Sequence, residues 1–245
     1  MAPQKPLVVA ILKTGSTLPT VAARRGDFED WIALGMGLGP GQARVVDATS
    51  SAPLPELDEV AGAIVTGSAA MISAGAPWME RTGQWLAAAL RTGRPVLGIC
   101  FGHQLLAQAL GGVVGPNPRG REIGTVWLRL APAAREDPLL GVLPPVARVQ
   151  VTHRESVLDP PPGIRSLAES DLDPVQALRF GERAWGVQFH PEFDAEIMRA
   201  YVRARRNDLV REGSNPAALL DAIGDDGAGG LLLRRFAELI GRDPS

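Results

Sequence analysis

The chain has 245 residues, of which 45% are hydrophobic and 21% are charged, with 25 basic and 27 acidic side chains. This composition is typical of a soluble globular protein and argues against disordered, fibrous and membrane-embedded classes. A formal net charge of −2 provides no broad cationic surface, so we expect neither nucleic acid nor a membrane as a partner. The length allows one continuous core, and we expect residues 1–245 to form a single domain with 194–245 as a C-terminal helical extension.

The first apolar run, Leu7–Leu12, is too short for the hydrophobic region of a signal peptide or for a membrane span, and it lacks a basic lead-in. We interpret it as the buried first strand of a cytoplasmic protein. Beyond it, short apolar or β-branched runs bounded by Gly, Pro and Asp alternate with longer segments of helical period. This alternation predicts an α/β fold with a mostly parallel central sheet and helices on both faces.

The predicted elements follow one another along the chain. The expected strands are Leu7–Leu12, Arg44–Asp47, Gly62–Thr66, Pro95–Ile99, Thr125–Leu130, Val146–Thr152, Val175–Arg179 and Trp185–Phe189. The clearest helices in the first half are Trp78–Arg91 and Gly102–Leu110, which lie on either side of the Pro95–Ile99 strand in the sequence.

From Val113 to Arg183 the chain is rich in Pro, Gly and short extended segments. We expect antiparallel β additions to the sheet there, with a brief helix near Asp137–Val142. Helices resume over Asp194–Glu212 and Gly230–Ile240. The stretch Gly224–Gly230 predicts a flexible break between them.

The chemistry is predicted to lie in the segment from Pro95 to Leu110. A buried strand runs into an amphipathic helix there, with Cys100 at the junction and Gly98 and Gly102 two residues to either side. This is a nucleophile elbow with Cys in place of Ser, in which small neighbours let strand and helix approach around a strained central residue. The amide of the next residue then points at the position where an attacked carbonyl oxygen becomes an oxyanion.

Cys100 is the only cysteine, which excludes an internal disulfide and a zinc site built from paired CxxC motifs. It is therefore either a buried core residue or a reactive thiol. The strand, the two glycines and the helix together favour the reactive thiol.

A thiol nucleophile needs a proton acceptor, and the chain has three histidines: His103, His153 and His190. His190 follows the last predicted strand and precedes Glu192 by two residues, so in extended chain the carboxylate and the ring face the same side. His153 has the same spacing to Glu155 and is the competing candidate. His103 lies one turn into the elbow helix, where a structural hydrogen bond is the expected role.

The segments GICFGHQ at 98–104 and QFHPE at 188–192 resemble the class I, or triad, glutamine amidotransferases, and most closely the stand-alone branch related to the GMP synthase glutaminase domain. The resemblance extends from the first strand to about Asp194. It implies a flavodoxin-like α/β fold and a triad of Cys100, His190 and Glu192. In that family the cysteine forms a γ-glutamyl thioester from glutamine and releases ammonia, and water then yields glutamate.

The resemblance also implies an oxyanion hole made from Gly67, Ser68 and Phe101. Many relatives have two successive glycines where this chain has Gly67 and Ser68, so a positive φ at Ser68 would be strained. For substrate binding, Gln104 matches the family's substrate-holding glutamine. The segment 152–157 matches the one whose main chain holds the α-amino and carboxylate end of the substrate, which implicates Arg154 and Glu155.

The sequence has no P-loop, no GxGxxG after a strand and no HExxH spacing, so we expect no nucleotide, no cofactor and no metal. Family members usually pass ammonia to a synthetase domain, for which the residues after His190 are too few. We therefore expect either a separate synthetase or acceptor subunit, or a hydrolase that acts alone on L-glutamine or another γ-glutamyl amide or peptide. A third hypothesis is a non-enzymatic regulatory or binding protein on the same fold, against which the retained triad residues argue.

Overall fold

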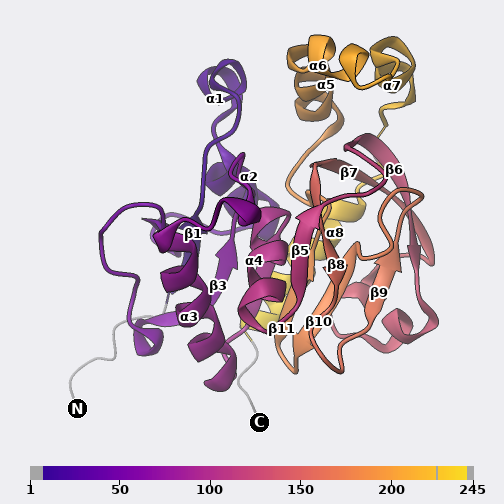
Figure 1. Cartoon of the computed structure of the whole chain (residues 1–245). Helices are drawn as coiled ribbons and strands as arrows, with labels where there is room; N and C mark the ends of the chain where they lie inside the picture. Colours follow the sequence, from indigo (N-terminus) through magenta and orange to yellow (C-terminus); the bar gives the residue numbers. More distant parts are fainter. Residues whose placement is uncertain (1–7, 225, 242–245) are drawn as a thin grey trace, which may run out of the picture.

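The computed structural model describes residues 8–224 and 226–241 (Figure 1). Its centre is a nine-stranded sheet, and a two-stranded sheet lies beside it. The strands of the large sheet, in spatial order, are β2 (Ala43–Asp47), β1 (Val8–Lys13), β3 (Val60–Val65), β4 (Val96–Ile99), β11 (Ala184–Val187), β10 (Ala177–Gly181), β9 (Ser166–Glu169), β6 (Glu122–Leu130) and β7 (Val146–His153). The small sheet pairs β5 (Val113–Pro116) with β8 (Glu155–Asp159).

The large sheet has a parallel half and an antiparallel half. Strands β2, β1, β3, β4 and β11 pair in parallel, whereas β10, β9, β6 and β7 continue the sheet in antiparallel pairs. The expected fold class, a parallel core with antiparallel β additions, is confirmed. All eight predicted strands overlap observed ones, but β5, β8 and β9 were not predicted.

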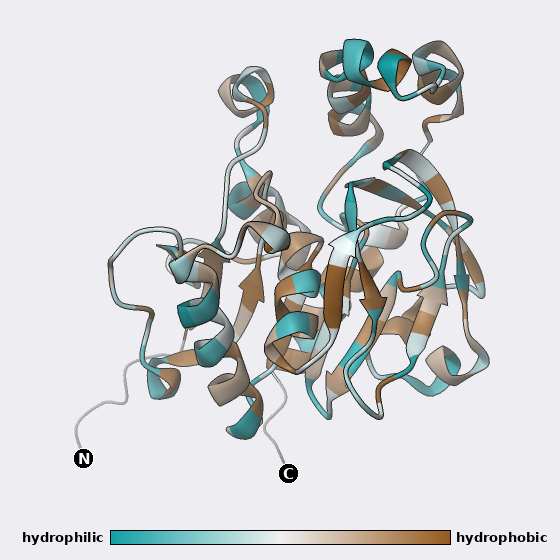
Figure 2. Ribbon diagram, in the orientation of Figure 1, coloured by the Kyte–Doolittle hydropathy of each residue, from teal (hydrophilic) through white to brown (hydrophobic). Residues whose placement is uncertain are grey.

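Helices cover both faces of the sheet. They are α1 (Pro19–Arg25), α2 (Phe28–Met36), α3 (Pro77–Arg91), α4 (Phe101–Ala109), α5 (Ala195–Ala204), α6 (Arg206–Arg211), α7 (Pro216–Ala222) and α8 (Ala228–Ile240). Within β1, Val9 and Ile11 pack with α2 and α8, while Ala10 and Leu12 pack with α3 and α4. This alternation gives the sheet two apolar faces and two cores, and Figure 2 shows hydrophobic colour along the central strands.

The C-terminal helices differ from the prediction in two respects. The expected helix Asp194–Glu212 is divided at Arg205 into α5 and α6, and α7 follows where no helix was predicted. The expected brief helix near Asp137–Val142 is a 3-10 turn at Leu140–Val142. In Figure 1, α5, α6 and α7 lie together at the end of the molecule where α1 also projects.

The predicted flexible break at Gly224–Gly230 was only partly correct. Helix α8 begins at Ala228, so Gly229 and Gly230 are helical. A Cβ atom on Gly229 would overlap the backbone carbonyl of Pro191. Gly229 is therefore required for close packing of α8 against the segment that carries His190 and Glu192, instead of serving as a flexible linker. Residue 225 lies outside the described residues.

Candidate active site

Three adjacent parallel strands assemble the candidate site at their carboxyl ends. Strand β4 pairs with β3 on one side and with β11 on the other. Gly67 follows β3, Cys100 follows β4 and His190 follows β11. The carboxyl ends of parallel strands are the usual position of ligand sites in open α/β sheets. The topology thus brings together residues that are far apart in the sequence.

Cys100 occupies the elbow between β4 and α4. Its φ of 50° is the only positive φ of a non-glycine residue within 8–224 and 226–241. The backbone N–H of Cys100 donates to the Val187 carbonyl at 2.8 Å, which fixes the turn to β11. A Cβ on Gly98 would overlap the carbonyl of Gly102, and a Cβ on Gly102 would lie 2.6 Å from the Val65 carbonyl oxygen. Both glycines are needed for this strained turn.

His190 and Glu192 form a buried pair. Nδ1 of His190 donates to Oε1 of Glu192 at 2.8 Å, and both side chains are at most 3% exposed. The His190 ring stacks on Phe193 with a centroid distance of 4.2 Å, and its backbone N–H donates to the Gln150 carbonyl at 2.8 Å. These contacts fix the ring orientation and leave Nε2 for a partner other than Glu192.

The charges around His190 favour its protonated form. Burial opposes a charged ring, but the negative charges of Glu192 and Cys100, with hydrogen bonds to both, raise the pKa of His190 to about 10. His190 therefore carries a proton at neutral pH that can be given to a leaving group.

Gly67 lies against both reactive side chains. A Cβ at Gly67 would be 2.8 Å from Cε1 of His190 and 3.8 Å from Cβ of Cys100. The following residue, Ser68, does not have the positive φ that would be strained, and its hydroxyl donates to the Thr14 carbonyl at 2.7 Å. Ser68 therefore fits this loop without backbone strain. Phe101 is the first residue of α4, so its N–H is one of the amides without an intrahelical partner.

The other two histidines have different environments: His153 is held by hydrogen bonds, whereas neither ring nitrogen of His103 has a hydrogen-bond partner among the described residues, so the structural hydrogen bond expected there is not found. Nδ1 of His153 lies 3.1 Å from the Glu155 carbonyl, and Nε2 lies 3.0 Å from the Glu122 carboxylate. His103 is fully buried against Phe180, and burial lowers its pKa to about 3. Neither ring is arranged as a proton acceptor for Cys100, which leaves His190 in that position.

The predicted substrate-binding residues lie in one hollow of about 150 Å³ that Cys100 also lines. Gln104 uses its amide nitrogen to donate to the Glu155 carbonyl at 2.6 Å and to Gln188 at 2.9 Å. The Glu155 carboxylate is buried and accepts from the backbone N–H of Ile72 at 2.6 Å, so it fixes the loop after Ser68. Arg154 is exposed at the mouth.

Sequence reasoning missed several residues around Cys100. Arg121 and Arg205 line the same hollow as Cys100. On the His190 side there is a second hollow of about 230 Å³, lined by Thr17, Tyr201 and again Arg205. These residues come from separate loops and helices, and no local motif connects them with the elbow.

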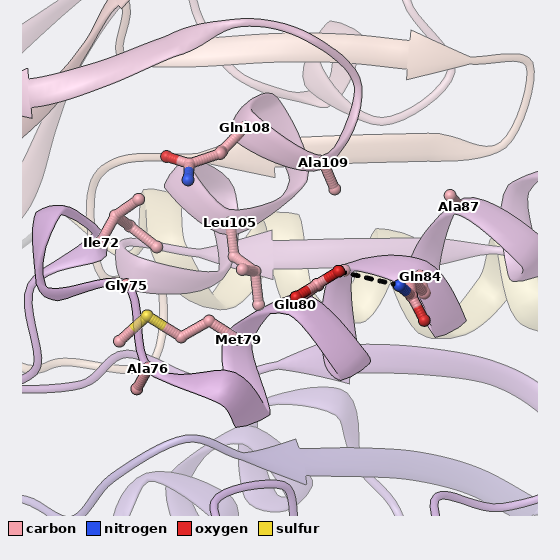
Figure 3. Close-up of a pocket in the computed structure, with 11 residues that line it drawn as sticks. Ile72, Gly75, Ala76, Met79, Glu80, Gln84, Ala87, Leu105, Gln108 and Ala109 are labelled. Atoms are coloured by element: carbon pink, nitrogen blue, oxygen red, sulfur yellow. Dashed lines mark hydrogen bonds between the residues drawn. The ribbon is translucent and has the colours of Figure 1, made fainter.

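A larger hollow of about 500 Å³ lies between α3 and α4, away from Cys100 (Figure 3). Among the described residues that line it, Glu80 is the only one with a titratable side chain, and it accepts from Gln84 at 3.2 Å. The residues that line this hollow include no cysteine, serine, threonine or histidine that could act together with Glu80. Residues 8–224 and 226–241 also contain no group of His, Cys, Asp and Glu arranged to hold a metal ion, and no helix long and apolar enough to cross a membrane.

Comparison with known proteins gives a family match. The model of the family described as glutamine amidotransferase class-I matches residues 42–205, which include Cys100, His190 and Glu192. A glutamine-hydrolyzing GMP synthase of Aeropyrum pernix is 38% identical over 151 residues, covering 61% of this chain and 28% of that protein. A subunit of the glutamine-hydrolyzing GMP synthase of Archaeoglobus fulgidus is 30% identical over 167 residues, covering 66% of this chain and 84% of that one.

The chain spans only part of some of these relatives. It matches 55% of the corresponding GMP synthase subunit from Ignicoccus hospitalis, to which it is 44% identical over 108 residues, or 44% of this chain. Among solved structures, a glutamine amidotransferase of Thermotoga maritima superposes with a TM-score of 0.76 at 21% identity, covering 97% of this chain and all of the other. At that identity the superposition supports the fold alone.

Proposed function

The chain belongs to the class I glutamine amidotransferase family, and on this premise we propose that it hydrolyses the side-chain amide of L-glutamine to glutamate and ammonia. The observation that carries the proposal is the position of Cys100, on a strained elbow beside the buried His190–Glu192 pair. A nucleophile, a base and a group that orients the base are the three parts required for acyl transfer through a covalent intermediate.

In the first half of the proposed reaction, Cys100 has given its thiol proton to His190, and its sulfur attacks the side-chain carbonyl carbon of glutamine. The C–S bond forms while the carbonyl electrons move to oxygen. As the tetrahedral intermediate collapses, the C–N bond breaks and the proton on His190 goes to the leaving nitrogen, which departs as ammonia. The raised pKa of His190 supports this role, since the ring holds that proton at neutral pH.

In the second half, water attacks the γ-glutamyl thioester. The now neutral His190 removes a proton from this water, the C–S bond breaks and glutamate is released. Glu192 holds the imidazole through Nδ1 and stabilises the imidazolium that forms. Together the two half-reactions return the cysteine and the histidine to their starting states, so glutamine and water are the only reactants needed.

We assign the oxyanion hole to backbone amides near Gly67 and Ser68 and to the amide of Phe101. The first-turn position of Phe101 in α4 supports this role, because N–H groups at a helix start lack intrahelical acceptors. Gly67 lies close to both His190 and Cys100, which supports the assignment of backbone amides near Gly67 and Ser68 to the other side of the oxyanion hole.

Substrate binding is assigned to Gln104, Arg154 and Glu155, which line the hollow at Cys100. The side-chain amide nitrogen of Gln104 is used in two hydrogen bonds, so the side-chain oxygen of Gln104 is the atom that remains to bind the substrate. The Glu155 carboxylate acts indirectly, since it is occupied by backbone amides of the loop at Ile72. Its part is to hold that wall of the hollow in place.

For the fate of the ammonia, we propose transfer to a separate acceptor or synthetase subunit. Several relatives are named as one subunit of a GMP synthase, which supports a partner protein. No nucleotide, cofactor or metal takes part in the glutamine hydrolysis itself in this proposal.

One observation favours a second candidate function, the hydrolysis of another γ-glutamyl amide or peptide. The hollow of about 230 Å³ lies on the His190 side of the site, where the leaving nitrogen of a substrate must depart. A substituent on that nitrogen could occupy this space. Glutamine itself has no such substituent.

A substrate panel tests the two functions together. Ammonia release from L-glutamine and amine release from γ-glutamyl amides with methyl, ethyl and larger substituents are measured for the wild type and for Cys100→Ala. Turnover of glutamine with the highest kcat/KM supports the amidotransferase function, and preference for a substituted amide supports the second. Absence of turnover for every compound would contradict both and favour a non-enzymatic protein.

A further inference from the structure

Arg205 has an unusual position between the two hollows of the site. It is the residue that separates α5 from α6, and it lines both the hollow at Cys100 and the hollow at His190. Its guanidinium lies over the ring of Tyr201 at 5.4 Å from the centroid. The side chain is half-buried, and its Nε is buried without a hydrogen-bond partner among the described residues.

The hollow at Cys100 contains more positive charge than the surrounding carboxylates balance. Arg121 is paired through two hydrogen bonds, of 2.7 and 2.9 Å, with Glu212, the residue that follows α6. Arg154 contacts the Met71 sulfur at 3.8 Å, and in the described part of the chain neither Arg154 nor Arg205 has an ion pair. The Glu155 carboxylate is already occupied by backbone amides.

This surplus of charge is costly in the absence of an anion. Burial, and then the nearby charge of Arg121, lower the pKa of Arg205. A half-buried guanidinium with a free N–H is stabilised strongly by a carboxylate, because the planar fork of donors matches the two carboxylate oxygens. The unpaired Nε and the absence of an ion pair between Arg205 and any carboxylate in the described residues both indicate that the partner comes from the ligand.

We propose that Arg205 binds the α-carboxylate of the γ-glutamyl substrate and makes the enzyme selective for substrates in which that carboxylate is free. The inference rests on the proposed function, because it takes Cys100 as the atom that meets the side-chain carbonyl in the same hollow. Arg121, already paired with Glu212, holds the adjacent wall. The helical segment after β11 thus supplies a specificity residue to a site otherwise built at the ends of the sheet strands.

The test compares L-glutamine with its α-methyl ester, which keeps the side-chain amide but lacks the carboxylate charge. Ammonia release is measured for the wild type, Arg205→Met and Arg205→Lys. Arg206→Met is the matched control, since Arg206 is the exposed neighbour on α6 and lies outside both hollows. Thermal unfolding of each variant establishes that the fold is retained.

We expect Arg205→Met to raise KM for glutamine about ten- to hundredfold, the cost of losing a charge-assisted hydrogen bond, with kcat within a few-fold of wild type. KM for the ester should be nearly unchanged. Arg205→Lys should show a smaller increase for glutamine, and Arg206→Met none. Equal KM values for glutamine in the wild type and Arg205→Met would overturn the proposal.

A binding measurement separates this proposal from the proposed function. Calorimetry of L-glutamate with Cys100→Ala and with the double variant Cys100→Ala/Arg205→Met needs no turnover. Weaker glutamate binding by the double variant supports the role of Arg205 even if the wild type fails to hydrolyse glutamine. Equal binding contradicts that role even if hydrolysis is fast.

Discussion

Gly229, in the first turn of α8, packs directly on the backbone of Pro191, the residue between His190 and Glu192. A Cβ at Gly229 would overlap the Pro191 carbonyl. The last helix of the chain therefore supports the segment that holds the base and its orienting carboxylate. A helix far from Cys100 in the sequence thereby affects the position of the His190 ring.

This contact predicts the effect of Gly229→Ala. Alanine normally stabilises a helix by about 1 kcal/mol relative to glycine, but here the methyl group must displace Pro191, and overpacking typically costs about 1–3 kcal/mol. We expect lower thermal stability and a reduced kcat with little change in KM. Gly230→Ala is the control, because its nearest neighbour is the flexible end of Arg234 at 3.2 Å. Equal effects of the two substitutions on kcat would show that the Pro191 contact is unimportant.

Substitution of the two competing histidines should have very different effects on kcat. His190→Asn is expected to lower kcat for glutamine by on the order of 10⁴-fold, since the proton carrier is lost, and also to lower the melting temperature at neutral pH, because the buried Glu192 carboxylate loses its charged partner. His153→Asn should cost less activity but about 1–3 kcal/mol of stability, because the buried Glu122 carboxylate loses a partner. Steady-state kinetics and thermal unfolding measure the two quantities. A greater loss of kcat in His153→Asn would exchange the assigned roles.

The pKa of His190 predicts a titration in the alkaline range. The ¹H NMR signal of its ring should change with a midpoint near pH 10, far above the ordinary value of 6.5. Glu192→Gln should move this midpoint downward, because it removes a negative charge that favours the imidazolium. A midpoint near 6.5 in the wild type would contradict the electrostatic coupling of His190 with Cys100 and Glu192.

The same shift makes stability depend on pH with a defined sign. The pKa of His190 is higher in the folded state than in the unfolded state, so the folded protein binds the proton more tightly. The resulting stabilisation is complete below pH 6.5 and is lost as pH rises through about 10. The difference in free energy of unfolding between wild type and His190→Asn should fall over that interval. A constant difference would mean that His190 does not titrate there.

The sequence predicted those parts of the molecule that are specified by local patterns. The elbow at Cys100 could be predicted because the flanking glycines and the change from strand to helix are contiguous. His190 and Glu192 were paired on the premise of extended chain, but the structure has a turn there, in which the Phe193 N–H donates to the His190 carbonyl at 3.3 Å and the Glu192 carboxylate reaches the ring. The parallel half of the sheet followed from the alternation of apolar runs and helices.

Other parts depend on tertiary contacts. Strands β5 and β9 have four residues each, and Val113 of β5 is 52% exposed, so they lack a clear apolar alternation. Helix α2 does have a readable start, a capping box between Asp27 and Asp30, which the prediction missed. Arg205 could not be assigned to the site from sequence, because its role depends on the junction of α5 and α6 lying over the carboxyl ends of the strands.

The central claim, that Cys100 is the nucleophile for glutamine, is tested most directly by covalent labelling with 6-diazo-5-oxo-L-norleucine, a reactive mimic of glutamine. Intact mass spectrometry and peptide mapping of the labelled wild type should reveal a single adduct on Cys100. Excess L-glutamine should slow its formation, and Cys100→Ala should remain unlabelled while keeping its melting temperature. An adduct on another residue, or glutamine hydrolysis by Cys100→Ala at the wild-type rate, would contradict the account.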